Sequence, residues 1–227
     1  MDPESLARLR LLQLADSTLP IGAAAHSFGL ETLTSEGLLD TEHLESFLRD
    51  YLVEMAPLEG AFCRSAHRLG AGPEFSVDGW VDLNRRVSAR KPARESRIAA
   101  ATLGRRFLGL LLDLGEWPRL RLARERAAAV YPSTAFGLAG AVLGLEEEAT
   151  VLAFLHQATA GLISACQRLL PLGQTRAARL LWDLKPLILE LAAQSRAGDP
   201  GEGPSFPALL ELGAMRHPDL STRLFIS

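Results

Sequence analysis

Hydrophobic residues along this chain recur every three to four positions, the spacing that places them on one face of an α-helix. Leu44, Leu48 and Leu52 follow this pattern, and Phe47 and Tyr51 extend the same face. No alternation of apolar and polar residues is long enough to predict a strand. The sequence therefore predicts an all-α protein. Helices are expected at about residues 6–14, 24–36, 41–69, 78–91, 92–114, 119–130, 133–143, 146–170, 174–197 and 208–216.

Proline and glycine residues punctuate these helices. Pro57 is expected to interrupt or kink the helix at 41–69, and Pro186 to kink the one at 174–197. Pro92 suits the first turn of a new helix, and Asp78 is a candidate cap for the helix before it. Residues 198–207 contain three glycines and three prolines and predict a loop.

The segment 127–167 is the least charged part of the chain, because its only Asp, Glu, Lys or Arg residues are Glu146, Glu147 and Glu148. A helix that is apolar on all sides is buried on all sides. The two helices predicted in the segment 127–167 are therefore expected at the centre of the bundle, or half in the centre and half in a subunit interface. The uncharged stretch 127–145 suits a buried helix better than a membrane span, since it is rich in Ala and Gly.

Composition supports one folded domain. The chain has 227 residues, of which 48% are hydrophobic and 22% charged, so it can build a full core. No internal repeat or linker is recognisable, and we expect a single-domain multi-helix bundle over residues 1–227. No N-terminal targeting signal is recognisable either, which predicts a cytoplasmic protein without a membrane segment.

Charge is unevenly distributed although the net charge is only −3. Residues 1–60 hold 11 acidic and 3 basic side chains, whereas residues 61–130 hold 14 basic and 7 acidic ones. The basic segment 85–97 is either a solvated helix face or a surface that steers a charged protein partner. Nucleic-acid binding is not expected, because the chain is net acidic and has few aromatic residues near this segment.

The familiar motifs of catalysis and metal binding are missing from the sequence. It contains no GxxxxGK[ST] phosphate loop, no GxGxxG and no GxSxG. The five histidines lack metal-site spacing, and Cys63 and His67, four positions apart, supply only two ligands. Cys63 and Cys166 are 103 positions apart and form no redox or zinc motif. We therefore expect no catalytic residues, no metal site and no cofactor.

Three segments are more specific than bundle packing requires. The first, residues 16–31, reads Asp-Ser-Thr-Leu-Pro-Ile-Gly and then His-Ser-Phe-Gly-Leu-Glu from position 26. The second, residues 168–175, reads Arg-Leu-Leu-Pro-Leu-Gly-Gln-Thr. The third comprises His217 and the end of the chain, Thr-Arg-Leu-Phe-Ile-Ser at 222–227. A chain that ends on large apolar residues usually docks its end somewhere.

Together these segments resemble the urease accessory protein family UreF over nearly the whole chain. The matching positions are Leu11–Leu14, Asp16, Ser17, Leu19, Pro20, Gly22, His26, Ser27, Gly29, Leu30, Glu31, Glu95, Ser96, Arg97, Gly104, Phe136, Gly137, Arg168, Leu169, Pro171, Leu172, Gly173, Gln174, Thr175, Arg223, Leu224, Phe225 and Ser227. The sequence departs from the family pattern at Ala24, where an aromatic residue is common, at Val130 and Tyr131, where a histidine is common, and at Ala178, where a glutamine is common.

The resemblance implies an all-helical, dimeric protein without chemistry of its own. It implies partnership with the accessory protein UreD, also called UreH, and with the GTPase UreG, in an assembly that delivers nickel to apo-urease. Two mechanisms remain open: activation of the GTPase, for which an arginine would be supplied, and a checkpoint that binds one conformer of its switch loops. The alternatives to this family role are an enzyme with scattered catalytic residues and a helical dimeric ligand-binding or scaffold protein unrelated to urease.

The resemblance also singles out residues for partner binding, and none for catalysis or metal binding. We expect the segment Arg223–Phe225 to dock onto the UreD-type partner; in the alternative, it folds back onto its own bundle. The expected partner-binding residues are His26, Ser27, Gly29, Glu31, Arg168, Pro171, Gly173, Gln174, His217, Arg223, Leu224 and Phe225.

Overall fold

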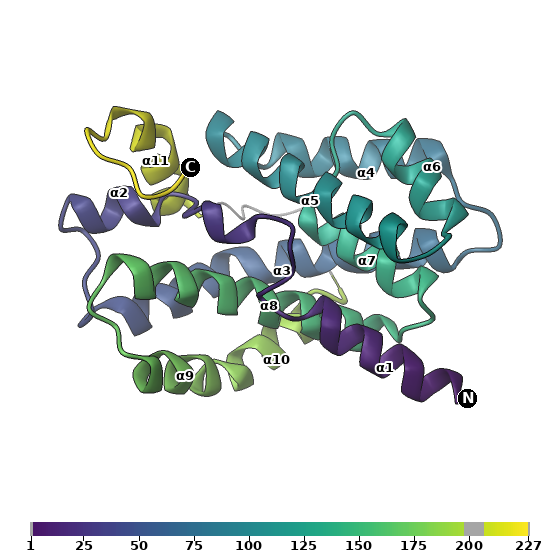
Figure 1. Cartoon of the computed structure of the whole chain (residues 1–227), viewed down its shortest axis with the longest axis horizontal. Helices are drawn as coiled ribbons and strands as arrows, with labels where there is room; N and C mark the ends of the chain where they lie inside the picture. The colour runs from purple at the N-terminus through teal and green to yellow at the C-terminus, as the bar shows by residue number, and fades with distance from the viewer. Residues whose placement is uncertain (1, 198–206, 227) are drawn as a thin grey trace.

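The computed structural model describes residues 2–197 and 207–226, and these residues form helices without any strand. The predicted all-α bundle is thereby confirmed (Figure 1). In chain order the elements are α1 (Pro3–Leu14), η1 (Ala23–Ala25), α2 (Leu30–Ser35), α3 (Leu44–Ala71), α4 (Val77–Ala89), α5 (Arg94–Leu114), α6 (Pro118–Arg126), α7 (Pro132–Val142), α8 (Glu147–Leu169), α9 (Gln174–Asp183), α10 (Lys185–Gln194), α11 (Ala208–Arg216) and η2 (His217–Asp219).

The centre of the molecule is α7, which packs against α3, α5 and α8. Residues 133–140 of α7 are all buried, as expected for a helix that is apolar on every side. Gly137 lets α7 approach α3 closely, because a side chain there would overlap the backbone carbonyl of Cys63. The prediction of a central helix in this segment is confirmed.

The second apolar helix, α8, has a different environment. It is long and apolar enough to cross a membrane by length and composition, but half of that window is buried inside the protein. Helix α8 contacts α3, α7 and α10, and also α1, α2, α9 and η1, but Gly161, Ser164 and Arg168 along it are exposed. This helix therefore forms one wall of the bundle rather than its centre.

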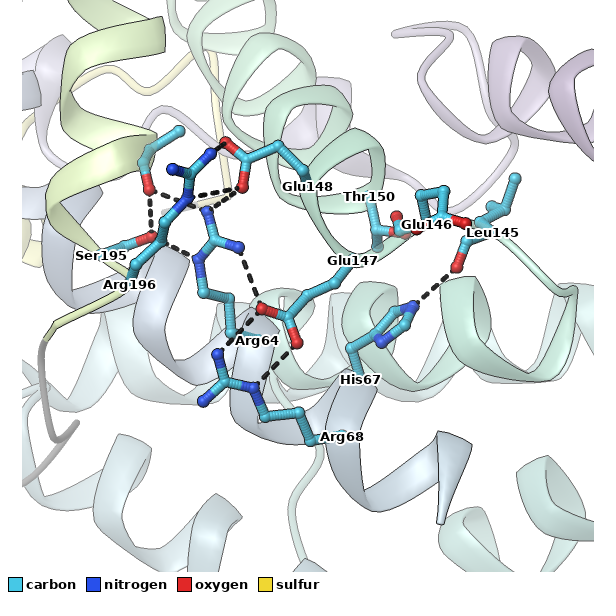
Figure 2. Close-up of polar contacts among 11 residues, drawn as sticks. Arg64, His67, Arg68, Leu145, Glu146, Glu147, Glu148, Thr150, Ser195 and Arg196 are labelled. Atoms are coloured by element: carbon cyan, nitrogen blue, oxygen red, sulfur yellow. Dashed lines mark hydrogen bonds and ion pairs between the residues drawn. The ribbon is translucent and has the colours of Figure 1, made fainter.

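A buried arginine fixes α8 and α10 on α3, as Figure 2 shows. The guanidinium of Arg64, on α3, donates to Glu147 at 3.0 Å and to Glu148 at 2.6 Å, both on α8. It also donates to the hydroxyl of Ser195 at 2.9 Å and to the carbonyl of Ala192 at 2.8 Å. Only 3% of the Arg64 side chain is exposed, so these acceptors replace the water it has lost.

Several helix boundaries differ from those predicted. Pro57 does not interrupt α3; Val53, whose carbonyl would have bonded the missing N–H, lies on an exposed part of the helix. The helix predicted at 174–197 is two helices that meet at Leu184 instead of one kinked helix. Ser76, not Asp78, caps α4, because the Ser76 hydroxyl accepts from the backbone N–H of Gly79 at 3.1 Å.

The largest difference concerns the helix predicted at 24–36. The structure has the short η1 and then α2, separated by residues 26–29, of which Phe28 and Gly29 have φ angles of 52° and 97°. Two consecutive residues in the left-handed region cannot continue an α-helix. The predicted loop 198–207 lies outside the described residues except for Pro207, which directly precedes α11.

Candidate functional site

The first specific segment folds into a turn that α11 closes. Asp16 starts the turn by accepting hydrogen bonds of 2.8 Å from the backbone and the hydroxyl of Thr18. At its end Gly29 lies against α11, where a side chain would overlap the carbonyl of Leu210. Gly213 on α11 touches Gly29 in return, so the two backbones meet where neither residue has a side chain. Helices α2 and α11 are therefore neighbours, at the end of the bundle where the chain terminates (Figure 1).

Glu31 on α2 is the centre of this region. Its carboxylate is buried and accepts a hydrogen bond of 2.8 Å from Nε2 of His217. It also accepts from the backbone N–H groups of Leu224 and of Phe225, the latter at 3.1 Å. Burial alone would raise the pKa of Glu31, but the hydrogen bonds from Leu224, His217 and Phe225 outweigh it and lower that pKa below its ordinary value. The charged carboxylate thus holds the end of the chain.

The terminal segment 220–226, here called the tail, has two further attachments. The backbone N–H of Ile226 donates to the carbonyl of Ala25 at 2.8 Å. The guanidinium carbon of Arg168, on α8, lies 4.1 Å from the centre of the Phe225 ring. Arg168 also donates to the carbonyl of Ala24, so one side chain joins the second specific segment to the other two.

Side chains of the tail alternate between protein and water. Phe225 is buried at 5% exposure, whereas Leu224 and Ile226 on either side of it are 57% and 73% exposed. Neighbouring α11 also exposes apolar side chains at Leu209 and Leu212. The fold-back expected as an alternative is therefore present at Phe225, while the tail still presents two large apolar side chains to solvent.

The sequence-predicted partner residues fall into three groups. Ser27, Gly29, Glu31, His217 and Phe225 are buried, and in this chain they shape the tail and its contact with α2. His26 is partly buried, and Arg168, Arg223 and Leu224 are exposed. The remaining three are exposed at the turn between α8 and α9, where the side chain of Gln174 accepts a hydrogen bond of 3.0 Å from Gln167 of α8; they are Pro171, Gly173 and Gln174.

A cavity of about 250 Å³ lies behind the tail, between η1, α3, α5, α8 and α11. Phe225 forms part of its wall, together with apolar side chains that include Ile21, Met55 and Phe154. The wall also contains an ion pair, in which Nζ of Lys91 lies 2.8 Å from Oε1 of Glu59.

Electrostatics in the cavity wall follow from burial. Burial raises the pKa of Tyr51, and the nearby carboxylates of Glu59 and Glu211 raise it further. Burial also raises the pKa of Glu211, although the backbone N–H of Ala93 donates to its carboxylate at 2.8 Å. For Glu59 the opposing attraction of Lys91 wins over burial and lowers the pKa. The ion pair between Lys91 and Glu59 is therefore charged.

Sequence reasoning did not identify this cavity or its ion pair. Lys91 belongs to the basic segment 85–97, which was expected to be a solvated face or a partner surface, but its ammonium group is bound to Glu59. The available signal was the position of Glu59, an acidic residue in the apolar stretch between Met55 and Phe62 of α3.

Metal ligands do not converge in the described residues: no group of three or more His, Cys, Asp or Glu side chains could hold an ion there. Cys63 and His67 are the two possible metal ligands that lie four positions apart. Nε2 of His67 is hydrogen-bonded to the carbonyl of Leu145 at 2.8 Å, so this nitrogen is already occupied. Cys63 and Cys166 are free and buried, and burial raises the pKa of the Cys63 thiol.

Fold and site together describe a helical protein whose conspicuous feature is a tail held on the N-terminal segment with apolar side chains exposed. Comparison with known proteins gives the family. A family model described as UreF matches residues 38–185. The chain is 31% identical to the urease accessory protein UreF of Geobacillus kaustophilus over 96% of this chain and 97% of that protein. It is 34% identical to the protein of the same name from Azorhizobium caulinodans, over 92% of this chain and 90% of that one. The chain belongs to the UreF family of urease accessory proteins.

Proposed function

We propose that this protein is a non-enzymatic adaptor in urease maturation, which acts in the cytoplasm as a homodimer. In this role it binds the UreD or UreH type of accessory protein and the GTPase UreG, and the assembly inserts nickel into apo-urease. Nickel is the cargo of the assembly, and within residues 2–197 and 207–226 no group of three or more His, Cys, Asp or Glu side chains could hold it. The observation that carries the proposal is the tail, whose backbone is fixed by Glu31 while Leu224 and Ile226 face solvent.

A fixed tail with exposed apolar side chains suits a docking element. Its backbone is already ordered, so a partner would lose little conformational entropy on binding it. Burying a leucine or isoleucine side chain contributes about 1.5–3 kcal/mol. Loss of both contacts would therefore weaken a complex by at least a factor of about ten. Docking and fold-back are compatible in this proposal, because Phe225 anchors the tail and its neighbours contact the partner.

The test is to replace Leu224 and Ile226 by alanine and to co-purify the variant with the UreD-type partner. We expect at least tenfold weaker binding and reduced urease activation, with an unchanged melting temperature for the isolated protein. Leu189→Ala is the matched control, because Leu189 is 58% exposed but lies on α10. Full-strength binding by the double variant would refute the tail as the docking element. Equal weakening by Leu189→Ala would also refute it, because the effect would then be unspecific.

The alternative of a ligand-binding or scaffold protein unrelated to urease is weakened by the family membership. An enzymatic role would be supported only by turnover of a substrate by the purified protein alone. We propose instead that the isolated protein hydrolyses neither GTP nor urea and binds nickel weakly at most. A tight, stoichiometric nickel site in the lone protein would make it a metal carrier and refute the adaptor proposal.

A further inference from the structure

The cavity behind the tail has access to solvent on the side of α8. Gly161 belongs to its wall and is exposed, as is Ser164 one helical turn later. A side chain at Gly161 would meet no other atom within 4 Å, so the space next to this residue is open. The deeper wall is mainly apolar and includes Met55, Leu103 and Phe154.

The volume and lining are those of a small-molecule site. An apolar cavity of about 150 Å³ is large enough for benzene, and this one has about 250 Å³. Ligand sites in proteins are typically concave and apolar with a few polar groups in the wall. The cavity is therefore large enough for one substituted aromatic ring or a molecule of similar size.

Charges in the wall determine the class of molecule that fits. Lys91 and Glu59 neutralise each other at 2.8 Å. Glu211 accepts from the backbone N–H of Ala93, and Arg168 is engaged by the carbonyl of Ala24 and the ring of Phe225. His26 and Arg90 are the other basic side chains in the cavity wall, and both also have partners within the protein.

An ionic ligand would have to break one of these interactions or remain unpaired in an apolar cavity, and both are unfavourable. A neutral ligand has neither cost. Burial and the nearby Arg106 lower the pKa of His26 below its ordinary value of 6.5. The imidazole of His26 therefore adds no positive charge to the cavity wall at neutral pH. From the cavity, its opening at Gly161 and its internally paired charges, we propose that it binds a small, uncharged, mainly apolar organic molecule.

The ligand would touch the ring of Phe225, which is at once part of the cavity wall and the anchor of the tail. The cavity is distinct from the exposed side chains of Leu224 and Ile226, so its occupancy can be tested without any partner protein. The inference thus holds or fails independently of the docking role proposed for the tail.

The test uses fluorobenzene as the probe and ¹⁹F NMR of the full-length protein as the readout. We expect saturable binding to the wild type. Gly161→Leu places a side chain in the open space and should weaken binding at least tenfold, whereas Gly161→Ala, which fills little of it, should bind as the wild type does. Ala100→Leu, on the α5 wall, provides a second obstruction in case Gly161→Leu alters the fold. Circular dichroism melting establishes which variants are folded.

Two ionic analogues that carry the same reporter, 4-fluorobenzoate and 4-fluorobenzylammonium, test whether the cavity excludes charged ligands. Each should bind at least tenfold more weakly than fluorobenzene. The proposal is overturned if the wild type shows no saturable binding, or if the folded leucine variants bind fluorobenzene as the wild type does. It is also overturned if either ionic analogue binds as well as the neutral probe.

Discussion

Glu31 and His217 are 186 positions apart, yet the carboxylate of one accepts a 2.8 Å hydrogen bond from Nε2 of the other inside the protein. This bond joins α2 to η2, and the same carboxylate holds the backbone of Leu224 and Phe225. A buried carboxylate with three donors is a strong point of attachment, because hydrogen bonds to charged groups are about twice as strong as neutral ones. The conformation of the tail therefore depends on the charge of Glu31.

The first prediction concerns the pH dependence of the tail. The folded-state pKa of Glu31 is lowered below the ordinary 4.5, so its stabilising effect is complete above that value. This effect is lost as the pH falls through the folded-state pKa. The amides of Leu224 and Phe225 should lose protection from hydrogen exchange in this acidic range, where protection is the exchange rate relative to the intrinsic rate at the same pH. Glu31→Gln should show low protection already at pH 7 and little further loss of protection in acid, whereas Glu42→Gln, at an exposed position, should behave as the wild type. Wild-type protection in Glu31→Gln at pH 7 would contradict the role given to the carboxylate.

The second prediction compares two glycines with positive φ angles. Gly29 and Gly37 have φ of 97° and 71°, but only Gly29 lies against another backbone. Gly37→Ala should destabilise the fold by about 1 kcal/mol, the cost of the left-handed conformation. Gly29→Ala adds the overlap with the carbonyl of Leu210 and should cost about 3 kcal/mol. Urea unfolding measures both free-energy changes. Equal changes would contradict the prediction, because they would mean that α2 and α11 can move apart at little cost in free energy.

The third prediction concerns the arginine cluster of Figure 2. Arg64→Ala removes a buried side chain, leaves the carbonyl of Ala192 without this donor, and should reduce the free energy of unfolding by about 3 kcal/mol. Glu147 and Glu148 keep their exposed partners Arg68 and Arg196, which limits the loss. Arg68 also binds Glu147, but its side chain is 61% exposed. Arg68→Ala should therefore cost no more than about 1 kcal/mol. Chemical denaturation of the two variants would contradict this account if their losses were similar.

The fourth prediction addresses the basic segment 85–97. Lys91 is bound to Glu59, so the exposed residues Arg85 and Arg94 are the better probes of this face. If the segment meets the GTPase, reversing both to glutamate should slow association at low salt and flatten its salt dependence. Reversal of Arg8 and Arg179 changes the net charge equally at other exposed positions and should have little effect. If the association rate of the Arg85 and Arg94 double variant is unchanged, segment 85–97 is a solvated helix face and not a surface for the GTPase.

The sequence by itself determined the helical class, the central position of α7 and the family, because hydrophobic spacing and short motifs are local properties. It also identified Glu31, His217, Phe225 and Arg168 as special, although in three separate segments. Only the tertiary structure decided that these residues meet, because contacts between residues far apart in the chain depend on how the helices pack.

The boundaries that sequence reasoning missed have the same origin. Nothing local indicates that Phe28 takes a positive φ angle; that conformation is held by the packing of Gly29 on α11. Lys91 was grouped with its basic neighbours, yet the fold turns it toward Glu59 on α3. Burial makes Lys91 part of an ion pair instead of a surface charge. Burial depends on how the chain packs, and the sequence pattern alone does not determine it.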